Sequence, residues 1–308
     1  MSKKSGKRSG TAQTILAERR NILSGGSSFY TREAYKTLRT NVNFSLADSD
    51  GCRVLLLTSA LQSEGKSITA LNLAISLAED GNRVILLDCD LRRPKLGRLV
   101  DISSMNGLSD TLIHPEILDN VICSYRMNLD VMMAGHIPPN PSELLGSARM
   151  GKLIEALKAR YDYIILDTPP VNVVTDAAVA SRWADGVLFV VRAGQSERGP
   201  VTHAVEQLSY AKANLLGFIL NGVDAEATGY SKYRYKRYGY YRYGYGKYGY
   251  GGKGYGYGYG GNGGYGHGYG GYGYGYGYGY GYGESPNASR QDAYNAVADS
   301  AAEARTGK

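Results

Sequence analysis

Residues 53–67 read RVLLLTSALQSEGKS, an apolar run of strand length followed directly by a loop that ends in Gly-Lys-Ser. The residues after this loop have a helical pattern, so the segment predicts a strand, a loop and a helix in succession. The loop from Ala60 to Ser67 matches the phosphate-binding pattern, with alanine in place of the first glycine. In such a loop the backbone amides bind phosphates, Lys66 reaches the β- and γ-phosphates, and the Ser67 hydroxyl binds Mg²⁺. The alternative is an ordinary turn between a strand and a helix.

The chain up to about residue 220 continues to alternate short apolar runs with helical segments. Strands are expected at Arg53–Thr58, Arg83–Asp88, Leu129–Met132, Tyr163–Asp167, Gly186–Val191 and Leu215–Leu220. Helices are expected at Thr31–Leu46 with Thr31 as N-cap, and at Lys66–Glu79, Gly107–Ile113, Ser147–Arg160, Thr175–Ala184 and Gly199–Lys212. This alternation predicts an α/β fold in which helices flank a mostly parallel sheet, as in P-loop nucleotide-binding proteins. Ligands of such sheets bind beyond the carboxyl ends of the strands.

Acidic residues end two of the expected strands. Asp88 and Asp90 follow the run Leu86-Leu87, and alternate residues of an extended chain face the same way, so both carboxylates should project together. Two neighbouring carboxylates repel each other unless a cation lies between them, and beside a phosphate loop that cation is Mg²⁺. Asp167 ends the other of these two strands, Tyr163–Asp167, and matches the Walker-B acid that holds metal. The alternatives are helix-capping, surface and turn acids.

An amide side chain follows the last expected strand. Asn221 precedes Gly222, where its amide would suit the hydrogen-bonding edge of adenine. Asn before Gly is also common in turns, and the sequence favours neither interpretation.

The C-terminal quarter has an unusual composition. Between Gly229 and Gly283 there are 24 Gly, 21 Tyr and seven Lys or Arg but no acid, so this segment carries the whole formal charge of +7. Such a segment cannot build a core and is expected to be disordered. The predicted organisation is a flexible basic arm over residues 1–27, a domain over 28–228, the tail over 229–283 and an extension over 284–308.

These motifs, together with the tail, resemble the bacterial tyrosine kinases (BY-kinases) of capsule and exopolysaccharide systems over about residues 28–225. The specific features are Asp88-x-Asp90-x-Arg92 after an apolar strand and a phosphate loop reading Ser-Glu-Gly-Lys-Ser. The related septum-placing and chromosome-partitioning ATPases carry a lysine where this chain has Leu61, which counts against them.

The resemblance implies ATP and Mg²⁺ as cofactors and assigns roles to the motif residues. Lys66, Asp88 and Asp90 would be catalytic, the two acids positioning metal and helping to activate the acceptor hydroxyl. Metal would be held by Ser67, Asp88, Asp90 and Asp167. The residues expected to bind ATP are Ala60, Ser63, Glu64, Gly65, Lys66, Ser67, Ile68, Arg92 and Asn221.

A charged helix before the first strand contacts a neighbouring subunit of a ring in this family, through the pattern Glu-x-x-Arg-x-x-Arg. The matching residues are Glu33, Lys36 and Arg39, with lysine in place of the first arginine. Lysine lacks the planar bidentate fork of arginine, so the strength of the contact is open. The spacing is nevertheless expected to align the three charges on one helix face. A solvated charged face is the alternative.

The tail resembles the tyrosine clusters that such kinases phosphorylate between subunits. Glycine neighbours would let the backbone enter a narrow site without side-chain clashes. The candidate phosphoacceptors are Tyr230, Tyr233, Tyr235, Tyr238, Tyr240, Tyr241, Tyr243 and Tyr245. The alternative is a low-complexity linker or self-associating tail.

The sequence also bears on the cellular compartment of the protein and on its partners. Three cysteines without metal-type spacing suit a reducing cytosol, and no apolar run approaches the length of a membrane span. A nucleic-acid partner is not expected, because arginine is sparse in the tail. The resemblance implies a cytoplasmic protein held at the membrane by a separate activator protein, a cognate phosphatase and further protein substrates.

The resulting hypothesis is an ATP-dependent protein-tyrosine kinase that phosphorylates its own tail between subunits and regulates polysaccharide synthesis and export. The alternative is a nucleotide-switched scaffold of the partitioning-ATPase kind, in which the tail is only a linker.

Overall fold

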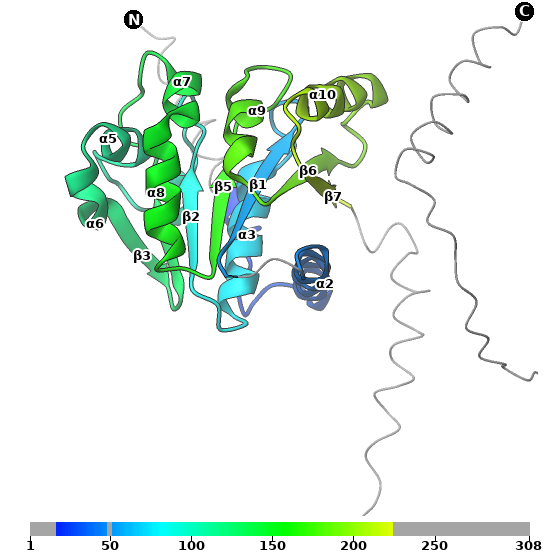
Figure 1. The fold of residues 1–308 in the computed structure, drawn as a ribbon. Helices are drawn as coiled ribbons and strands as arrows, with labels where there is room; N and C mark the ends of the chain where they lie inside the picture. Colours follow the sequence, from blue (N-terminus) through cyan, green and yellow to red (C-terminus); the bar gives the residue numbers. More distant parts are fainter. Residues whose placement is uncertain (1–16, 48–50, 224–308) are drawn as a thin grey trace, which may run out of the picture. The chain divides into compact units, whose positions relative to one another are not determined.

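A β-sheet forms the centre of the structure, a computed structural model that describes residues 17–47 and 51–223 (Figure 1). Within these residues seven strands are hydrogen-bonded in the order β3-β4-β2-β5-β1-β6-β7. Their bounds are β1 Arg53–Ser59, β2 Val84–Asp88, β3 Ile122–Arg126, β4 Leu129–Met132, β5 Tyr163–Asp167, β6 Gly186–Arg192 and β7 Leu215–Asn221. Neighbouring strands are parallel except β3 and β4, which are antiparallel. The expected tail and the extension after it lie outside the described residues.

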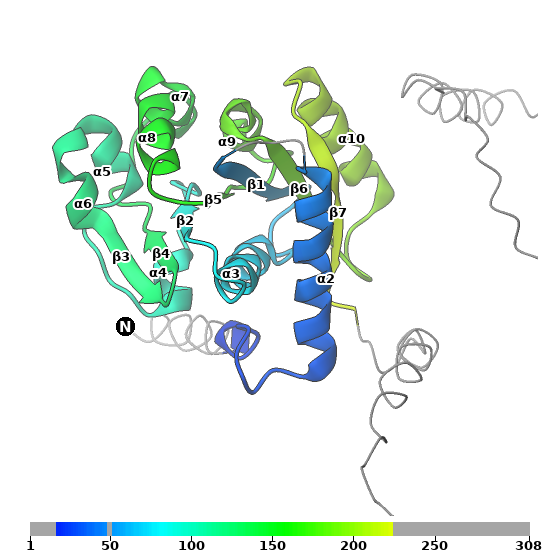
Figure 2. The ribbon, with the colours of Figure 1, turned by 60° about the horizontal axis from the view of Figure 1, so that its bottom comes forward.

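Helices cover both faces of the sheet (Figure 2). One face packs against α2 Phe29–Ser45, α3 Lys66–Ala78 and α4 Leu96–Val100. The opposite face packs against α5 Leu108–Ile113, α8 Ala148–Lys158, α9 Asp176–Ala180 and α10 Arg198–Tyr210. The remaining helical segments are α6 Leu118–Val121, α7 Pro141–Gly146 and the 3₁₀ turns η1 Pro115–Ile117 and η2 Ser181–Trp183. Among the described residues, no helix combines the length and the apolar character that a bilayer crossing requires.

The interior strand β1 shows why the sheet needs helices on both sides. Val54 and Leu56 pack into the core beneath α8 and α10, whereas Leu55 and Leu57 pack into the core beneath α3. All four side chains are fully buried. Because successive side chains of a strand point to opposite faces, a continuous apolar run is stable only when both faces are covered.

The expected α/β architecture is confirmed, and each of the six expected strands is found with ends that differ by at most one residue. The prediction missed β3, an antiparallel edge strand whose side chains are half-buried or exposed. An edge strand of this kind carries no continuous apolar run, so the sequence pattern does not reveal it. The short helices α4, α6 and α7 were also missed, because each is too brief for helical periodicity.

The residues before α2 differ from the expected flexible arm where the structure describes them. Leu23 is buried, and its backbone N–H donates to the Asn72 side chain of α3 at 2.7 Å. The Arg126 guanidinium donates to the Leu23 carbonyl at 2.9 Å. A buried leucine with both backbone groups bonded fixes this part of the segment to the domain. Helix α2 then begins earlier than expected, because Ser28 rather than Thr31 is its N-cap.

Candidate nucleotide and metal site

The phosphate loop connects β1 to α3 at the carboxyl end of the sheet. Two of its residues have positive φ, Ser63 at 65° and Gly65 at 91°. A Cβ on Gly65 would lie 1.9 Å from the Asn221 amide nitrogen, so glycine is required here for space as well as for conformation. Helix α3 begins at Lys66, directly after Gly65. The amides of the first turn therefore lie where a phosphate-binding loop needs them.

Lys66 lies inside the site rather than on its surface. Lys66 is only 8% exposed, and burial lowers the pKa of its ammonium group. The carboxylates of Asp167 and Asp90 act on this pKa in the opposite direction. An ammonium group held in the loop at this position can bind a phosphate oxygen directly, and it offsets part of the negative charge of the neighbouring acids.

Two buried carboxylates meet at the ends of neighbouring strands. Asp88 of β2 and Asp167 of β5 are register partners, and each is 1% exposed. Burial, followed by the charge of Asp167, raises the pKa of Asp88 well above its usual range. Burial also raises the pKa of Asp167, against the hydrogen bond from the Ser67 hydroxyl and the charge of Lys66. Two acids with raised pKa values favour a cation between them.

These residues fit a magnesium ion that shares its coordination with a nucleotide. Within the described residues, the Oδ1 atom of Asp167 is a buried acceptor without a hydrogen-bond partner, and Ser67 is bonded to the same carboxylate. No three His, Cys, Asp or Glu side chains in the described ranges gather closely enough to hold an ion by themselves. Mg²⁺ commonly takes one or two protein ligands and completes its shell with water and phosphate oxygens.

Asp90 lies in the loop that follows β2 rather than in the extended strand itself. Strand β2 ends at Asp88, whose carboxylate accepts hydrogen bonds from the backbone N–H groups of Asp90, Lys95 and Leu96 at 3.0–3.2 Å. Asp90 is half-buried and accepts from the Arg93 N–H at 3.0 Å. The acid at the strand end therefore shapes the following loop, and Asp90 is the more accessible of the two. Asp90 still raises the pKa of Asp88, so the carboxylates remain close.

Arg92, whose contact with ATP stays a prediction, forms a bidentate pair with a buried acid. Its Nε and Nη2 atoms lie 2.8 and 3.0 Å from the carboxylate of Asp176, which is fully buried. The Ser142 hydroxyl donates to the same carboxylate at 2.5 Å. This cluster joins the segments that follow β2, β4 and β5. Sequence reasoning missed Asp176 and Ser142, because neither ends a strand.

The other residues expected to bind ATP all lie in or beside the loop. Asn221 donates from its amide to the Glu64 carbonyl at 3.0 Å, and Glu64 itself is buried. Ala60 is buried, while Ile68 is half-buried on the first turn of α3. Asn221 therefore contacts the loop backbone, and the adenine contact considered for it stays a prediction.

The charged residues of α2 divide between two environments. Lys36 pairs with Glu33 at 2.8 Å on the exposed side of the helix. Arg39 turns inward instead, donating to the Ser76 carbonyl at 2.7 Å and pairing with Asp80 at 3.2 Å. The Arg39 guanidinium is thus engaged within the chain, whereas Glu33 and Lys36 pair with each other. The contact of all three residues with a second subunit stays a prediction.

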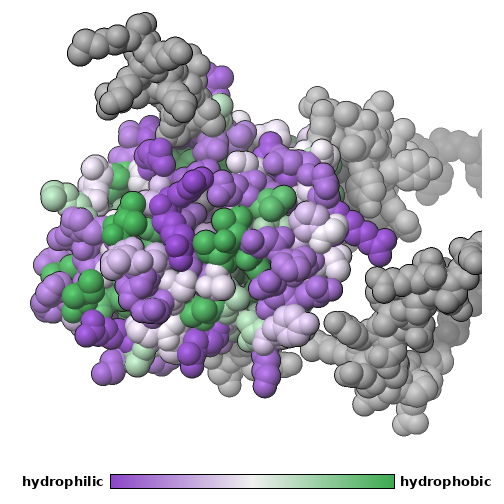
Figure 3. All heavy atoms as spheres, turned by 90° about the horizontal axis from the view of Figure 1, so that it is seen from above, coloured by the Kyte–Doolittle hydropathy of each residue, from purple (hydrophilic) through white to green (hydrophobic). Residues whose placement is uncertain are grey.

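The face at the carboxyl ends of the strands is mostly hydrophilic, with separate hydrophobic patches (Figure 3). Leu61 of the phosphate loop is 40% exposed, and Val173 of the segment after β5 is 50% exposed. The two segments touch, because the Asn172 N–H donates to the Ala60 carbonyl at 3.4 Å. Exposed apolar side chains thus lie beside the phosphate loop.

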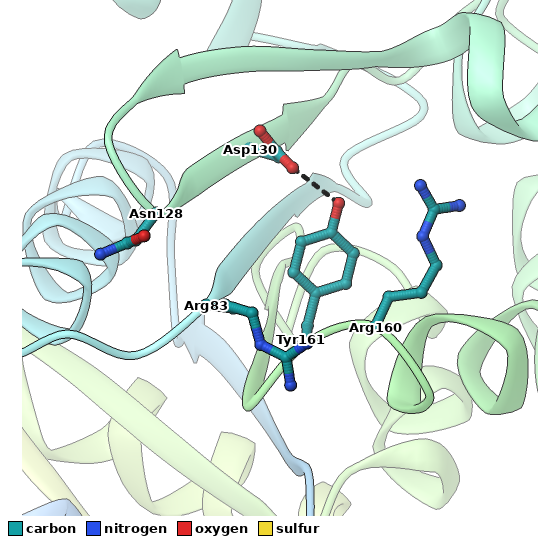
Figure 4. A pocket seen from close by; sticks show the side chains of 5 residues that line it. All are labelled: Arg83, Asn128, Asp130, Arg160 and Tyr161. Atoms are coloured by element: carbon teal, nitrogen blue, oxygen red, sulfur yellow. Dashed lines mark hydrogen bonds between the residues drawn. The ribbon is translucent and has the colours of Figure 1, made fainter.

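A cavity of about 320 Å³ lies away from this site, among residues at the amino ends of β2, β4 and β5 (Figure 4). Its lining includes the Tyr161 hydroxyl, which donates to Asp130 at 2.7 Å. The two arginines of the lining are already paired, Arg83 with Asp162 and Arg160 with Asp119. Because its charges are balanced, the cavity offers no anion site comparable to the phosphate loop.

Known proteins resemble this chain across the described domain. A family model described as an AAA domain matches residues 63–214. Tyrosine-protein kinase YwqD of Bacillus subtilis (strain 168) is 38% identical over 204 residues, which cover 66% of this chain and 85% of that protein. Tyrosine-protein kinase wzc of Salmonella typhimurium is 37% identical over 204 residues, 66% of this chain but 28% of that protein. The solved kinase domain of Escherichia coli tyrosine kinase ETK is 36% identical with a TM-score of 0.60, covering 63% of this chain and 76% of that domain.

Proposed function

Because this chain belongs to the family of bacterial tyrosine-protein kinases, we propose that it transfers the γ-phosphoryl group of ATP to tyrosines of its own C-terminal tail. The observation that carries this proposal is the meeting of Lys66, Ser67 and two buried carboxylates at the carboxyl end of the sheet. The resemblance to a named kinase over 85% of that protein's length supports the same reaction.

The residues present suit phosphoryl transfer to a phenol. The phenolic oxygen forms a bond to the γ-phosphorus as the bond to the bridging oxygen breaks and ADP leaves. Lys66 stabilises the charge on the transferring group. Asp90, accessible and bonded through one oxygen to the Arg93 N–H, is placed to take the phenolic proton. Mg²⁺ held by Ser67 and Asp167 would neutralise part of the phosphate charge.

The tail suits this site in charge and chemistry. It carries a formal charge of +7 between Gly229 and Gly283, whereas the site gathers Asp88, Asp90 and Asp167. The exposed Leu61 and Val173 offer apolar contacts for an incoming tyrosine ring. We propose the eight candidate tyrosines from Tyr230 to Tyr245 as the first acceptors.

Incubation of the purified full-length chain with Mg-ATP tests the activity. A tyrosine kinase produces phosphotyrosine and ADP in equal amounts, and mass spectrometry should place the phosphates in the tail. A nucleotide-switched scaffold, the second candidate function, would release ADP and free phosphate without phosphotyrosine. That outcome would overturn the proposal.

We further propose a ring-like homo-oligomer, in which the exposed pair Glu33 and Lys36 contacts a second copy. Replacing both residues by alanine should shift the sedimentation profile towards the monomer and slow phosphorylation between subunits, while the melting temperature stays the same. Arg39→Ala is the contrasting variant, because it removes contacts to Ser76 and Asp80 within one chain. It should lower the free energy of unfolding by about 1 kcal/mol. An unchanged profile for the double variant, with an oligomeric wild type, would exclude this contact.

We also propose a separate membrane protein that activates this kinase in a polysaccharide export system, together with a phosphatase that resets it. The support for this partnership is the resemblance to the tyrosine-protein kinases of the family. Co-purification with the membrane fraction, with and without the activator, would test this partnership.

A further inference from the structure

The phosphate loop contains a buried carboxylate that binds no cation in the described residues. Glu64 is 1% exposed, and its Oε2 atom accepts a hydrogen bond from the Leu61 N–H at 2.8 Å. Its Oε1 atom is bonded to the Ser196 hydroxyl, which lies in the turn after β6. Ser196 in turn accepts a hydrogen bond from the Arg192 N–H at 2.8 Å. Both carboxylate oxygens therefore point to protein donors.

Two further contacts reach the same short piece of the loop from the ends of β6 and β7. The Asn221 amide donates to the Glu64 carbonyl at 3.0 Å, and the Arg192 guanidinium donates to the Ser63 carbonyl at 3.4 Å. Ser63 has a φ of 65°, a conformation that non-glycine residues adopt only at a cost. The contacts from β6 and β7 thus hold the loop in a bend that its own sequence does not favour.

Electrostatics argues against a role for Glu64 as a direct ligand of the nucleotide. A carboxylate in an anion-binding loop repels phosphates, and the repulsion is stronger in a buried setting than in water. A group that opposes the ligand by its charge is useful there only through its geometry. The acceptor pair of Glu64 spans from the Leu61 N–H inside the loop to a hydroxyl outside it.

We propose that the Glu64–Ser196 contact is a brace that positions the phosphate loop for the nucleotide, with Ser196 and Glu64 acting as positioning residues. This inference rests on the nucleotide binding of the proposed function. Without the Ser196 hydroxyl, a buried carboxylate oxygen loses its donor, and of the contacts between the bent loop and the end of β6 only that of Arg192 to the Ser63 carbonyl is left. The phosphate-binding amides would then have to be ordered by the nucleotide itself, which weakens its binding.

A matched pair of variants isolates the hydroxyl. Ser196→Thr keeps it, whereas Ser196→Val has the shape of threonine without it. Binding of a fluorescent ADP analogue with Mg²⁺ should be about tenfold weaker in the valine variant and close to wild type in the threonine variant. Ser181→Ala, which removes a buried serine hydroxyl elsewhere in the domain, should bind like wild type. Equal affinities for the valine and threonine variants would overturn the brace, and melting temperatures would show that each variant is folded.

Glu64→Gln gives a second test, in which a charge effect and a positioning effect change nucleotide binding in opposite directions. If Glu64 acted only through its charge, removing that charge should strengthen nucleotide binding. If Glu64 acts as a brace, the NH₂ group of the glutamine must face either the Leu61 N–H or the Ser196 hydroxyl, each of which donates to Glu64 in the wild type. Nucleotide binding should then weaken, and the KM for ATP should rise more than kcat falls. Tighter binding by this variant would refute the brace. A wild type that binds no nucleotide would refute the proposed function instead.

Discussion

Replacing Lys66 by methionine is expected to abolish both tyrosine phosphorylation and ATP hydrolysis while the fold survives. Lys66 is 8% exposed, and burial already lowers the pKa of its ammonium group, so an apolar side chain of similar length fits its place. Bound phosphates would lose the buried cation of the loop, and the negative charges of Asp90 and Asp167 would no longer be offset by it. Loss of such an electrostatic contact typically reduces turnover at least about a hundredfold.

Lys152→Met is the control for this variant. Lys152 is exposed on α8, so its loss changes the net charge equally without touching the loop. The control Lys152→Met should form phosphotyrosine at the wild-type rate and unfold at the wild-type temperature. Lys66→Met should match the wild type in thermal unfolding only. Undiminished phosphorylation in Lys66→Met would contradict the kinase mechanism itself.

The parts of the fold that sequence could predict are those with a strong local pattern. The run Tyr163–Asp167 is fully buried, and a short continuous apolar segment between polar flanks is typical of a strand covered on both faces. The edge strand β3 was not predicted because it pairs with β4 alone and its residues carry no continuous apolar run. The inward turn of Arg39 is likewise set by Asp80, which follows another helix and which sequence spacing does not reveal.

The site shows the same division between local and long-range information. The strand, loop and helix around Lys66 are contiguous in sequence, so their arrangement could be predicted. Arg92 and Asn221 lie in the right region, yet their partners are fixed by segments far away in sequence, Asp176 for the first and Glu64 for the second. A motif therefore identified the region but not the contact each side chain makes.

Asp167→Asn is expected to inactivate the enzyme and to stabilise the nucleotide-free fold at the same time. Turnover with Mg-ATP should fall at least about a hundredfold, because the unpartnered Oδ1 atom of Asp167 is the acceptor best placed for metal. Stability should move the other way, because the raised pKa of Asp167 means that the folded state disfavours its charged form. Removing the charge should also relieve its register partner Asp88, for a gain of about 1 kcal/mol at neutral pH.

The pH dependence of unfolding separates relief of charge repulsion from better packing of the asparagine. An acid with a raised folded-state pKa binds more protons in the folded than in the unfolded protein. The contribution of protonated Asp167 to the free energy of unfolding is therefore lost as the pH rises from about 4 through the folded-state pKa of about 6. The asparagine variant lacks this group. Its free energy of unfolding should therefore exceed that of the wild type only slightly in acid, and the difference should grow towards neutral pH. Urea unfolding of both proteins without nucleotide or metal, across that range, measures the difference. An advantage that is constant with pH would show that charge repulsion between Asp88 and Asp167 is not its cause. An asparagine variant that phosphorylates tyrosine at the wild-type rate would remove Asp167 from the metal site.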